Sequence, residues 1–139
     1  MTVKDYLDQV RLLELKHRYR LQELERLRDE VSPIRGVTYD SARVMTSTKK
    51  STKTEELIDR IVDMERELLV EAAEISEKRR HIIAQIERVP DRRYRELLLL
   101  KYVDGYGLRT IACKMGYSYD RAKHMHGQAL IEFAKVSTE

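Results

Sequence analysis

Hydrophobic residues recur with helical spacing through most of the first 90 residues. Over residues 3–31 they return at three- and four-residue steps, with Arg, Lys and Glu between them, which predicts one long amphipathic helix. A second helix is predicted over about 54–89, where aliphatic residues stand at strict seven-residue intervals: Ile61, Leu68, Ile75, Ile82 and Val89. Such a heptad repeat is typical of a coiled-coil seam. Neither helix can bury its stripe alone, so each requires a partner.

The segment between these helices, residues 32–53, is rich in Ser, Thr and Lys and is interrupted by Pro33 and Gly36. This composition predicts a flexible loop that lets the second helix fold back antiparallel against the first. Thr52 and Glu55 have the spacing of a capping box at the start of that helix. We therefore expect a long antiparallel, coiled-coil-like helical hairpin over residues 1–90. The stripes leave three assemblies open: an intramolecular hairpin, a dimer of hairpins and a domain-swapped homodimer.

Residues 91–139 show a different pattern, in which three shorter helical segments follow one another. The first begins with Asp91 directly after Pro90, an arrangement that favours a helix start. It carries Leu97, Leu98 and Leu100 toward a small core. Three helices in about 45 residues are near the minimum that can bury a shared core around a helix-turn-helix. We therefore expect a second domain over 91–139.

Two further helices are predicted on either side of Gly116. Ile111 and Ala112 lie on one face of the earlier helix, and the methyl group of Ala112 allows a close crossing with the later one. Gly116 stands where the chain must reverse, a place that favours a residue tolerating positive φ. Ser118 stands at the N-cap of the last helix, 119–135. The pattern predicts a helix-turn-helix, so the fold class is all-α.

Charge is distributed unevenly between these two parts. Among the 139 residues, 37% are charged and 42% hydrophobic, which suits one or two small helical domains. Residues 91–139 hold nine Lys and Arg against six Asp and Glu, whereas residues 1–90 hold eighteen of each. The excess of positive charge thus accompanies the helix-turn-helix, which favours double-stranded DNA as a partner.

The cysteine content and the distribution of apolar residues indicate in which cellular compartment the protein works. The single Cys113 excludes an intramolecular disulfide, and the chain has no long apolar run and no signal-like N-terminus. We therefore expect a cytoplasmic protein with no membrane partner.

The sequence shows no pattern typical of catalysis or of a metal site. Acidic residues of the long helices alternate with basic ones, and there is no glycine-rich phosphate loop or nucleophile motif. His124 and His126 point about 200° apart on a helix, and no ligand cluster completes a site. His17 falls on the apolar seam of the first helix, where a lone polar residue sets register. We expect no enzyme activity, no metal and no cofactor.

The segment 91–133 resembles region four of bacterial housekeeping sigma factors, because a leucine-rich helix, a glycine-containing loop, an I-A-x-x-M-G helix and a serine-started helix follow in that order. The whole chain is similar to a family of short sigma-like transcriptional regulators of Gram-positive phages and prophages. Members pair a helical hairpin with a C-terminal M-G-Y-S-Y…H…H-G-x-A-L segment, here within 115–130. The chain departs from sigma factors at Ala122, where Val or Ile is usual, and at Gly107, where a capping Ser is common. No segment matches region two, so we do not expect a complete sigma factor.

The resemblance implies a sequence-specific DNA-binding regulator of phage or prophage genes in a bacterial host. The last helix, 119–135, would read the major groove, and host RNA polymerase would be a further partner. Arg121, Lys123 and Gln128 are the candidates for base edges or phosphates. The other candidates on this helix and its cap are Ser118, Tyr119, Asp120 and His124. The candidates for positioning on the DNA backbone are Arg109, Thr110, Lys114, Arg92 and Arg93.

Two other functions fit the same pattern. Phage DNA-packaging proteins of the small-terminase type also combine a helix-turn-helix with a coiled coil, but they usually place the DNA module first. A protein-binding adaptor of RNA polymerase would need no DNA contact. Target sequence and sign of regulation are not encoded in any pattern that we recognise.

Overall fold

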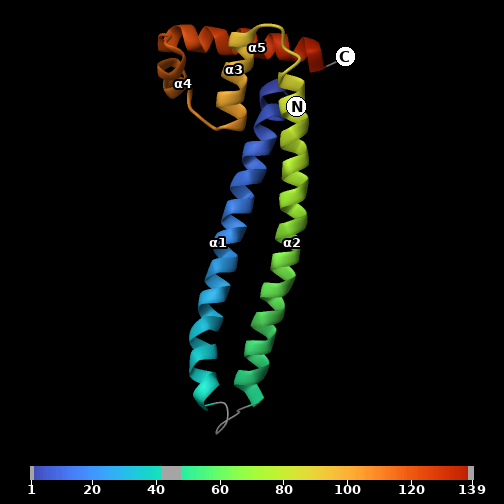
Figure 1. Ribbon diagram of the computed structural model, residues 1–139, viewed down its shortest axis with the longest axis vertical. Helices are drawn as coiled ribbons and strands as arrows, with labels where there is room; N and C mark the ends of the chain where they lie inside the picture. Colours follow the sequence, from blue (N-terminus) through green and yellow to red (C-terminus); the bar gives the residue numbers. More distant parts are fainter. Residues whose placement is uncertain (1, 42–47, 138–139) are drawn as a thin grey trace. The chain divides into compact units, whose positions relative to one another are not determined.

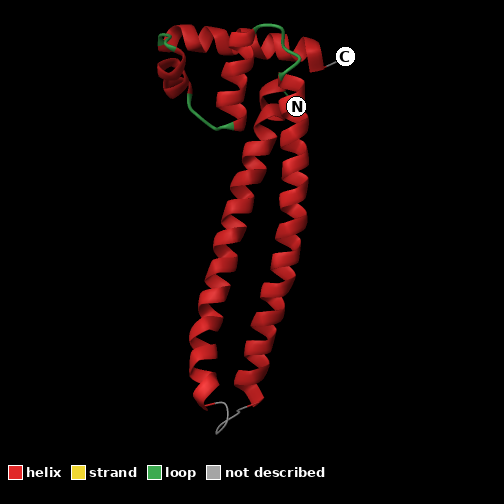
Figure 2. Ribbon diagram, viewed as in Figure 1, coloured by secondary structure: helices red, strands yellow, loops and turns green. Residues whose placement is uncertain are grey.

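The protein is all-helical, as the sequence predicted. The computed structural model describes the backbone of residues 2–41 and 48–137 and the side chains of 2–31 and 52–137, and within these ranges every regular element is a helix (Figures 1 and 2). The elements are α1 (Val3–Ser41), α2 (Thr48–Ile86), α3 (Arg92–Leu98), the π-helix η1 (Leu99–Val103), α4 (Leu108–Met115) and α5 (Tyr119–Ser137). None of the described helices is both long and apolar enough to span a bilayer.

Helices α1 and α2 both extend into the segment 32–53, which the sequence predicted to be a loop. Helix α1 continues to Ser41 and α2 begins at Thr48, so the expected loop is wrong for residues 32–41 and 48–53, and 42–47 lie outside the described residues. The expected capping box at Thr52 consequently falls inside α2. Proline and glycine were interpreted as helix ends, but an internal proline removes one hydrogen bond and can bend a helix without ending it. Extending an existing helix is also far easier than starting one.

The end of α2 comes earlier than predicted. Ile86 is its last residue, and the N–H groups of Arg88 and Val89 then bond three residues back, at 3.1 and 3.0 Å. These tighter turns precede Pro90, which disfavours helical geometry in the residue before it. The heptad prediction itself is confirmed for most positions, because Leu68, Ile75, Ile82 and Val89 are buried.

The chain divides into two compact units, and α1 and α2 contribute to both. Unit 1 comprises Met1–Glu14 and Glu74–Glu139, and unit 2 comprises Leu15–Ala73. This division differs from the boundary expected at residue 90. The physical reason is the core of unit 1, in which the start of α1 and the end of α2 share one hydrophobic cluster with the C-terminal helices.

The core of unit 1 draws on every helix of that unit. Tyr102 and Phe133 are its largest fully buried side chains, and the Tyr6 hydroxyl donates a hydrogen bond to Gln85 Oε1 at its edge. The buried residues of the cluster are Leu7, Val10, Ile82, Ile86, Val89, Leu97, Leu98, Tyr102, Ile111, Met125, Ala129 and Phe133. Burial of this many apolar side chains is the main stabilising contribution in unit 1.

The first helix predicted after Pro90 is present over 92–103, but it changes from α to π geometry within its length. Asp91 caps α3 by accepting a hydrogen bond from the Arg93 N–H at 2.8 Å, which confirms the predicted start. The chain then widens into η1, where Leu99 O accepts from the Asp104 N–H at 3.0 Å, an i to i+5 bond. Such π-turns often accompany functional sites, and this one carries the buried Tyr102.

In unit 2 the later part of α1 and the earlier part of α2 pack antiparallel (Figure 1). Its buried side chains are Leu24, Leu27 and Val31 from α1 and Leu68 from α2. Ion pairs join the two helices in antiparallel order: Arg20 pairs with Glu67 at 2.7 Å and Arg28 with Glu65 at 2.9 Å.

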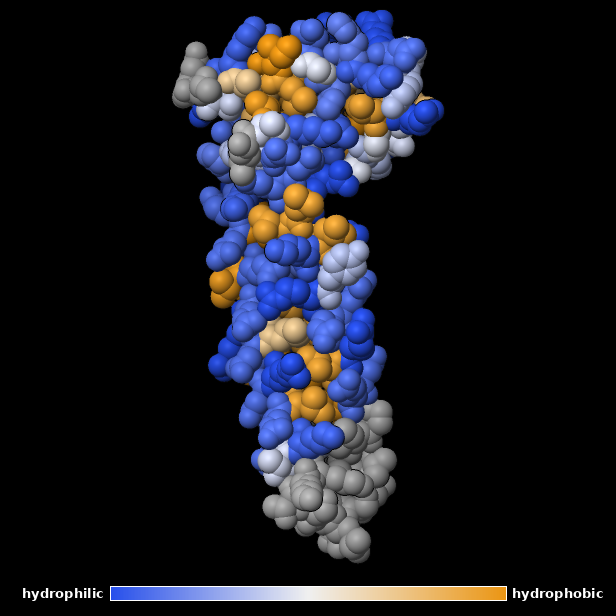
Figure 3. All heavy atoms as spheres, turned by 180° about the vertical axis from the view of Figure 1, so that it is seen from behind, coloured by the Kyte–Doolittle hydropathy of each residue, from blue (hydrophilic) through white to orange (hydrophobic). Residues whose placement is uncertain are grey.

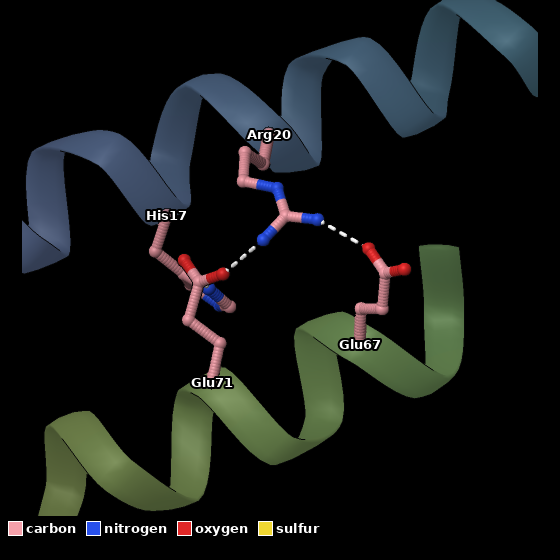
Figure 4. A network of polar contacts seen from close by, with 4 residues as sticks. All are labelled: His17, Arg20, Glu67 and Glu71. Carbon is pink, nitrogen blue, oxygen red and sulfur yellow. Dashed lines mark hydrogen bonds and ion pairs between the residues drawn. The ribbon is translucent and has the colours of Figure 1, made fainter. Parts of the chain in front are cut away.

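A polar network also lies at this interface. In Figure 4, His17 and Arg20 of α1 both contact the carboxylate of Glu71 on α2. His17 Nδ1 lies 3.2 Å from Glu71 Oε1, and Arg20 donates a hydrogen bond to Oε2. The side chains of His17 and Glu71 are about one fifth exposed, at 19% and 21%. The position of His17 at the helix interface agrees with its predicted place on the seam.

Unit 2 also exposes large apolar side chains. Figure 3 shows hydrophobic side chains among hydrophilic ones along the surface of α1 and α2. The most exposed in unit 2 are Leu69, at 73%, and Tyr19 and Val70, each at 61%.

Candidate nucleic-acid interface

The turn between α4 and α5 has the geometry that the sequence predicted. Gly116 follows the last residue of α4 with a φ of 76°, in the left-handed region that favours glycine. The Tyr117 N–H donates to Ala112 O at 2.8 Å and the Gly116 N–H to Cys113 O at 3.3 Å. This pair of bonds is a Schellman motif, which satisfies the last carbonyls of α4 and fixes the direction in which the chain leaves it.

Helix α5 begins as expected at Tyr119. The Ser118 Oγ accepts a hydrogen bond from the Arg121 N–H at 3.2 Å, which confirms its predicted N-cap role. Ala112 of α4 and Ala122 of α5 are both buried, and α4 packs against α5. Small side chains at these positions let the helices approach closely, and the polar side of α5 remains exposed.

The structure places the predicted DNA-contacting side chains at the surface of unit 1, apart from Gln128, which is partly buried. The exposed candidates are Arg92, Arg93, Arg109, Thr110, Lys114, Ser118, Tyr119, Asp120, Arg121, Lys123 and His124. They come from the starts of α3 and α5 and from α4, so three elements contribute polar side chains to the surface.

Tyrosine rings lie beneath several of these cations. Arg109 Cζ and Lys123 Nζ lie 4.5 and 4.8 Å from the centroid of the Tyr119 ring. Arg121 Cζ lies 4.5 Å from the Tyr117 ring centroid. These are cation–π distances, at which the electron-rich ring face attracts the positive charge.

The same arrangement occurs at the loop before α4, where Lys114 Nζ lies 4.6 Å from the ring centroid of Tyr106. Sequence reasoning did not find the contacts of Tyr106 and Tyr117 with these cations, and Tyr117 also packs against the core of unit 1. Tyr117 lies in the turn before α5, so helical spacing does not relate it to Arg121, and its contact with that residue depends on the geometry of the Gly116 turn.

Arg93 is engaged differently from the other candidates. Its Nη2 lies 3.1 Å from Asp91 Oδ2, and hydrogen bonding to Asp91 raises the pKa of Arg93, with a smaller contribution from Tyr117. The ion pair of Arg93 and Asp91 has no net charge, so it attracts a phosphate less strongly than an unpaired arginine does. At the start of α3, Arg92 is therefore the better candidate for contact with the DNA backbone.

The two histidines of α5 lie in different surroundings. His124 is exposed, whereas the ring of His126 is stacked on buried Tyr102, with Nε2 2.6 Å from the tyrosine hydroxyl. Burial, followed by nearby Lys101 and Lys4, lowers the pKa of His126 to about 4. Burial also raises the pKa of Tyr102. Both groups are thus neutral near pH 7, and a hydrogen bond joins the tyrosine hydroxyl to Nε2 in a packed polar pair.

Among the residues that the structure describes, no three His, Cys, Asp or Glu side chains lie where they could share a metal ion. Comparison of the whole chain with protein-family models, curated proteins and solved structures finds no match.

Proposed function

We propose that the chain is a sequence-specific DNA-binding transcription regulator of phage or prophage genes. In this proposal α4, the Gly116 turn and α5 form a sigma region-four-like helix-turn-helix, and α5 enters the major groove. The observation that carries the proposal is the exposed face of α4 and α5, where basic side chains lie over tyrosine rings. Basic surfaces interleaved with aromatic rings are typical of nucleic-acid interfaces.

The chemistry of α5 suits recognition in a groove. The major groove admits one α-helix, and an arginine donates to both acceptors of a guanine edge. Arg121 and Lys123 are exposed on the first two turns of α5, where a recognition helix meets base edges. Arg109, Thr110 and Lys114 of α4 are exposed as well and supply contacts to phosphates, which position a protein without reading sequence.

The remaining parts of the chain take a supporting role in this proposal. Helices α1 and α2 form a helical hairpin, and host RNA polymerase is the partner implied by the resemblance to region four. The proposal places the protein in the cytoplasm of the bacterial host.

The test is retardation of a labelled duplex of mixed sequence over a range of salt concentrations, with and without RNA polymerase. We expect binding by the protein alone, with an affinity that falls linearly as the logarithm of the salt concentration rises, because phosphate contacts release counterions. Selection from a random duplex library then identifies the preferred site. Failure to retain any duplex at low salt, with or without polymerase, contradicts the proposal.

A second candidate, an adaptor that docks on RNA polymerase without DNA contact, is favoured by the exposed apolar side chains of unit 2. Leu69, Val70 and Tyr19 are each more than half exposed, and exposed apolar groups favour protein partners when they gather in a patch. Retention of the chain by immobilised RNA polymerase, together with no retention of duplex, would favour this adaptor. Duplex binding by the chain alone favours the regulator.

A further inference from the structure

We propose that Tyr119 is a positioning residue whose ring holds Arg109 and Lys123 in place for contact with DNA phosphates. The inference rests on the proposed function and deepens it, because it assigns to the first residue of α5 a role that acts through two neighbouring cations. Both cations lie over this one ring, at 4.5 and 4.8 Å from its centroid.

The three residues come from two helices. Arg109 is in the first turn of α4, whereas Tyr119 and Lys123 stand four residues apart on α5 and so share one face. The ring of Tyr119 therefore links the exposed surfaces of α4 and α5. Lys123 also lies 3.7 Å from Asp120, whose side chain is 93% exposed, and an ion pair so open to water holds a lysine only weakly.

The ring contact and a phosphate contact are compatible. A guanidinium that stacks on an aromatic face keeps its N–H donors at the edge of its plane, free to donate to an anion. An ammonium over a ring likewise retains donors directed away from it. Arginine and lysine side chains otherwise lose much rotamer freedom when they bind a phosphate. Restricting them beforehand reduces that loss, which is the physical benefit of the arrangement.

The inference predicts a loss of affinity without a loss of charge. Tyr119→Leu removes the ring and leaves both cations, so the number of phosphates neutralised and the salt slope stay the same. Affinity for a labelled duplex of mixed sequence falls about three- to tenfold. Tyr119→Phe keeps the ring and stays within about twofold of the unchanged protein. Tyr19→Leu, at an exposed tyrosine of unit 2, is the matched control and leaves affinity unchanged.

A double-mutant cycle separates positioning from direct contact. In a background carrying Arg109→Ala and Lys123→Ala, the Tyr119→Leu change has no cations left to act through, so we expect no further loss. An equal loss in both backgrounds overturns the inference, because the ring then contacts DNA itself or supports the fold. No loss in the unchanged background overturns it too.

A measurement without DNA tests separately whether the Tyr119 ring holds Arg109 and Lys123. Protons next to the charged groups of Arg109 and Lys123 lie over the ring face, so their NMR signals shift upfield. We expect these shifts in the unchanged protein and in Tyr119→Phe, and their loss in Tyr119→Leu. If these shifts are absent, the inference is overturned even when duplex binding supports the proposed function. If the shifts are present but the protein binds no duplex, the contact of Tyr119 with the two cations is real and its proposed role in DNA binding is wrong.

Discussion

Units 1 and 2 are both helical, but they are held together by different means. The core of unit 1 contains fully buried side chains such as Leu98, Tyr102 and Phe133, and the hydrogen-bonded pair of Tyr102 and the partly buried His126 is neutral near pH 7. Unit 2 has an apolar seam of Leu24, Leu27, Val31 and Leu68, and the polar network of His17, Arg20, Glu67 and Glu71 lies at the same helix interface. Apolar burial supplies most of the stability in such structures, whereas partly exposed ion pairs supply little. We infer that unit 1 is a stable platform and that the charges of unit 2 mainly fix how its helices pair.

The surfaces of the two units differ as well. Unit 1 exposes basic side chains over tyrosine rings. The two most exposed aliphatic side chains of the described residues, Leu69 and Val70, lie in unit 2, although unit 1 also exposes Leu12 and Ile131. Cations and rings suit nucleic acid, whereas aliphatic groups suit protein. The comparison therefore favours unit 1 as the site of the DNA contact that we propose.

The largest effect is expected from the core of unit 1. Phe133 is fully buried, so Phe133→Ala should lower the free energy of unfolding by about 4 kcal/mol, the usual cost of an aromatic cavity. Hydrogen exchange resolves the effect by residue: amides of residues 92–137 should lose protection most. Tyr19→Ala, at an exposed ring of unit 2, is the control and should change little. Equal losses from the two substitutions would contradict the contrast between the units.

The polar pair of unit 1 makes its stability depend on pH. The pKa of His126 is about 4 in the folded protein and about 6.5 in an unfolded chain. Between these values the unfolded chain binds the extra proton, so stability is lost as the pH falls from about 6.5 to about 4. After allowance for partial exposure, the loss is on the order of 2 kcal/mol.

Urea unfolding between pH 7 and pH 4.5 measures this loss. His126→Gln should flatten the profile in this range, whereas His124→Gln, at an exposed histidine, should leave it unchanged. A profile that is the same in all three proteins would show that the Tyr102–His126 pair is not the origin of the pH dependence.

Two glycines of unit 1 should respond with opposite signs. Gly116 has a φ of 76°, and a methyl group there meets nothing within 4 Å, so Gly116→Ala costs only backbone strain, about 1 to 2 kcal/mol. Gly127 lies inside α5 and is equally open, so Gly127→Ala should stabilise by about 0.5 to 1 kcal/mol. Thermal unfolding measures both. Stabilisation by Gly116→Ala would contradict the proposed turn geometry.

The smallest effect is expected from the network of unit 2. Glu71→Gln keeps the shape of the side chain but removes the charge that His17 and Arg20 share. We expect a loss of about 0.5 to 1 kcal/mol at low salt, which 1 M salt should largely abolish. Glu23→Gln, at an exposed pair with Arg26 within α1 of unit 2, is the matched control. A loss that persists in high salt would mean that packing, and not charge, holds this interface.

Local patterns in the sequence predicted much of the fold. The heptad positions of α2, the left-handed Gly116 and the Ser118 cap depend on residues within a few positions of one another, so spacing and residue type were sufficient. The continuation of α1 through Pro33 was not predicted, because a proline can either bend or end a helix. The π-turn of η1 was not predicted, because the run of leucines in which it begins is equally compatible with an ordinary α-helix.

The candidate interface was predicted in part for the same reason. Exposed polar positions of α5 follow from helical spacing, and apart from the partly buried Gln128 those residues are exposed in the structure. The contact of Arg109 with Tyr119 joins two helices and depends on how they cross, which spacing does not reveal. The pairing of Tyr102 with His126 likewise depends on the packing of η1 against α5.

The most direct test of the central claim compares matched charge removals in the two units. Arg121→Ala with Lys123→Ala removes two cations from α5, and Arg60→Ala with Arg66→Ala removes two exposed cations from α2 of unit 2. Affinity for a labelled duplex of mixed sequence is measured for each double variant over a range of salt concentrations. We predict that the α5 variant binds at least about tenfold more weakly and that its salt slope falls by about 1 to 2, as expected when phosphate contacts are lost. The α2 variant should bind like the unchanged protein. Equal weakening in both variants, or unchanged affinity and slope in the α5 variant, would contradict the assignment of DNA contact to unit 1.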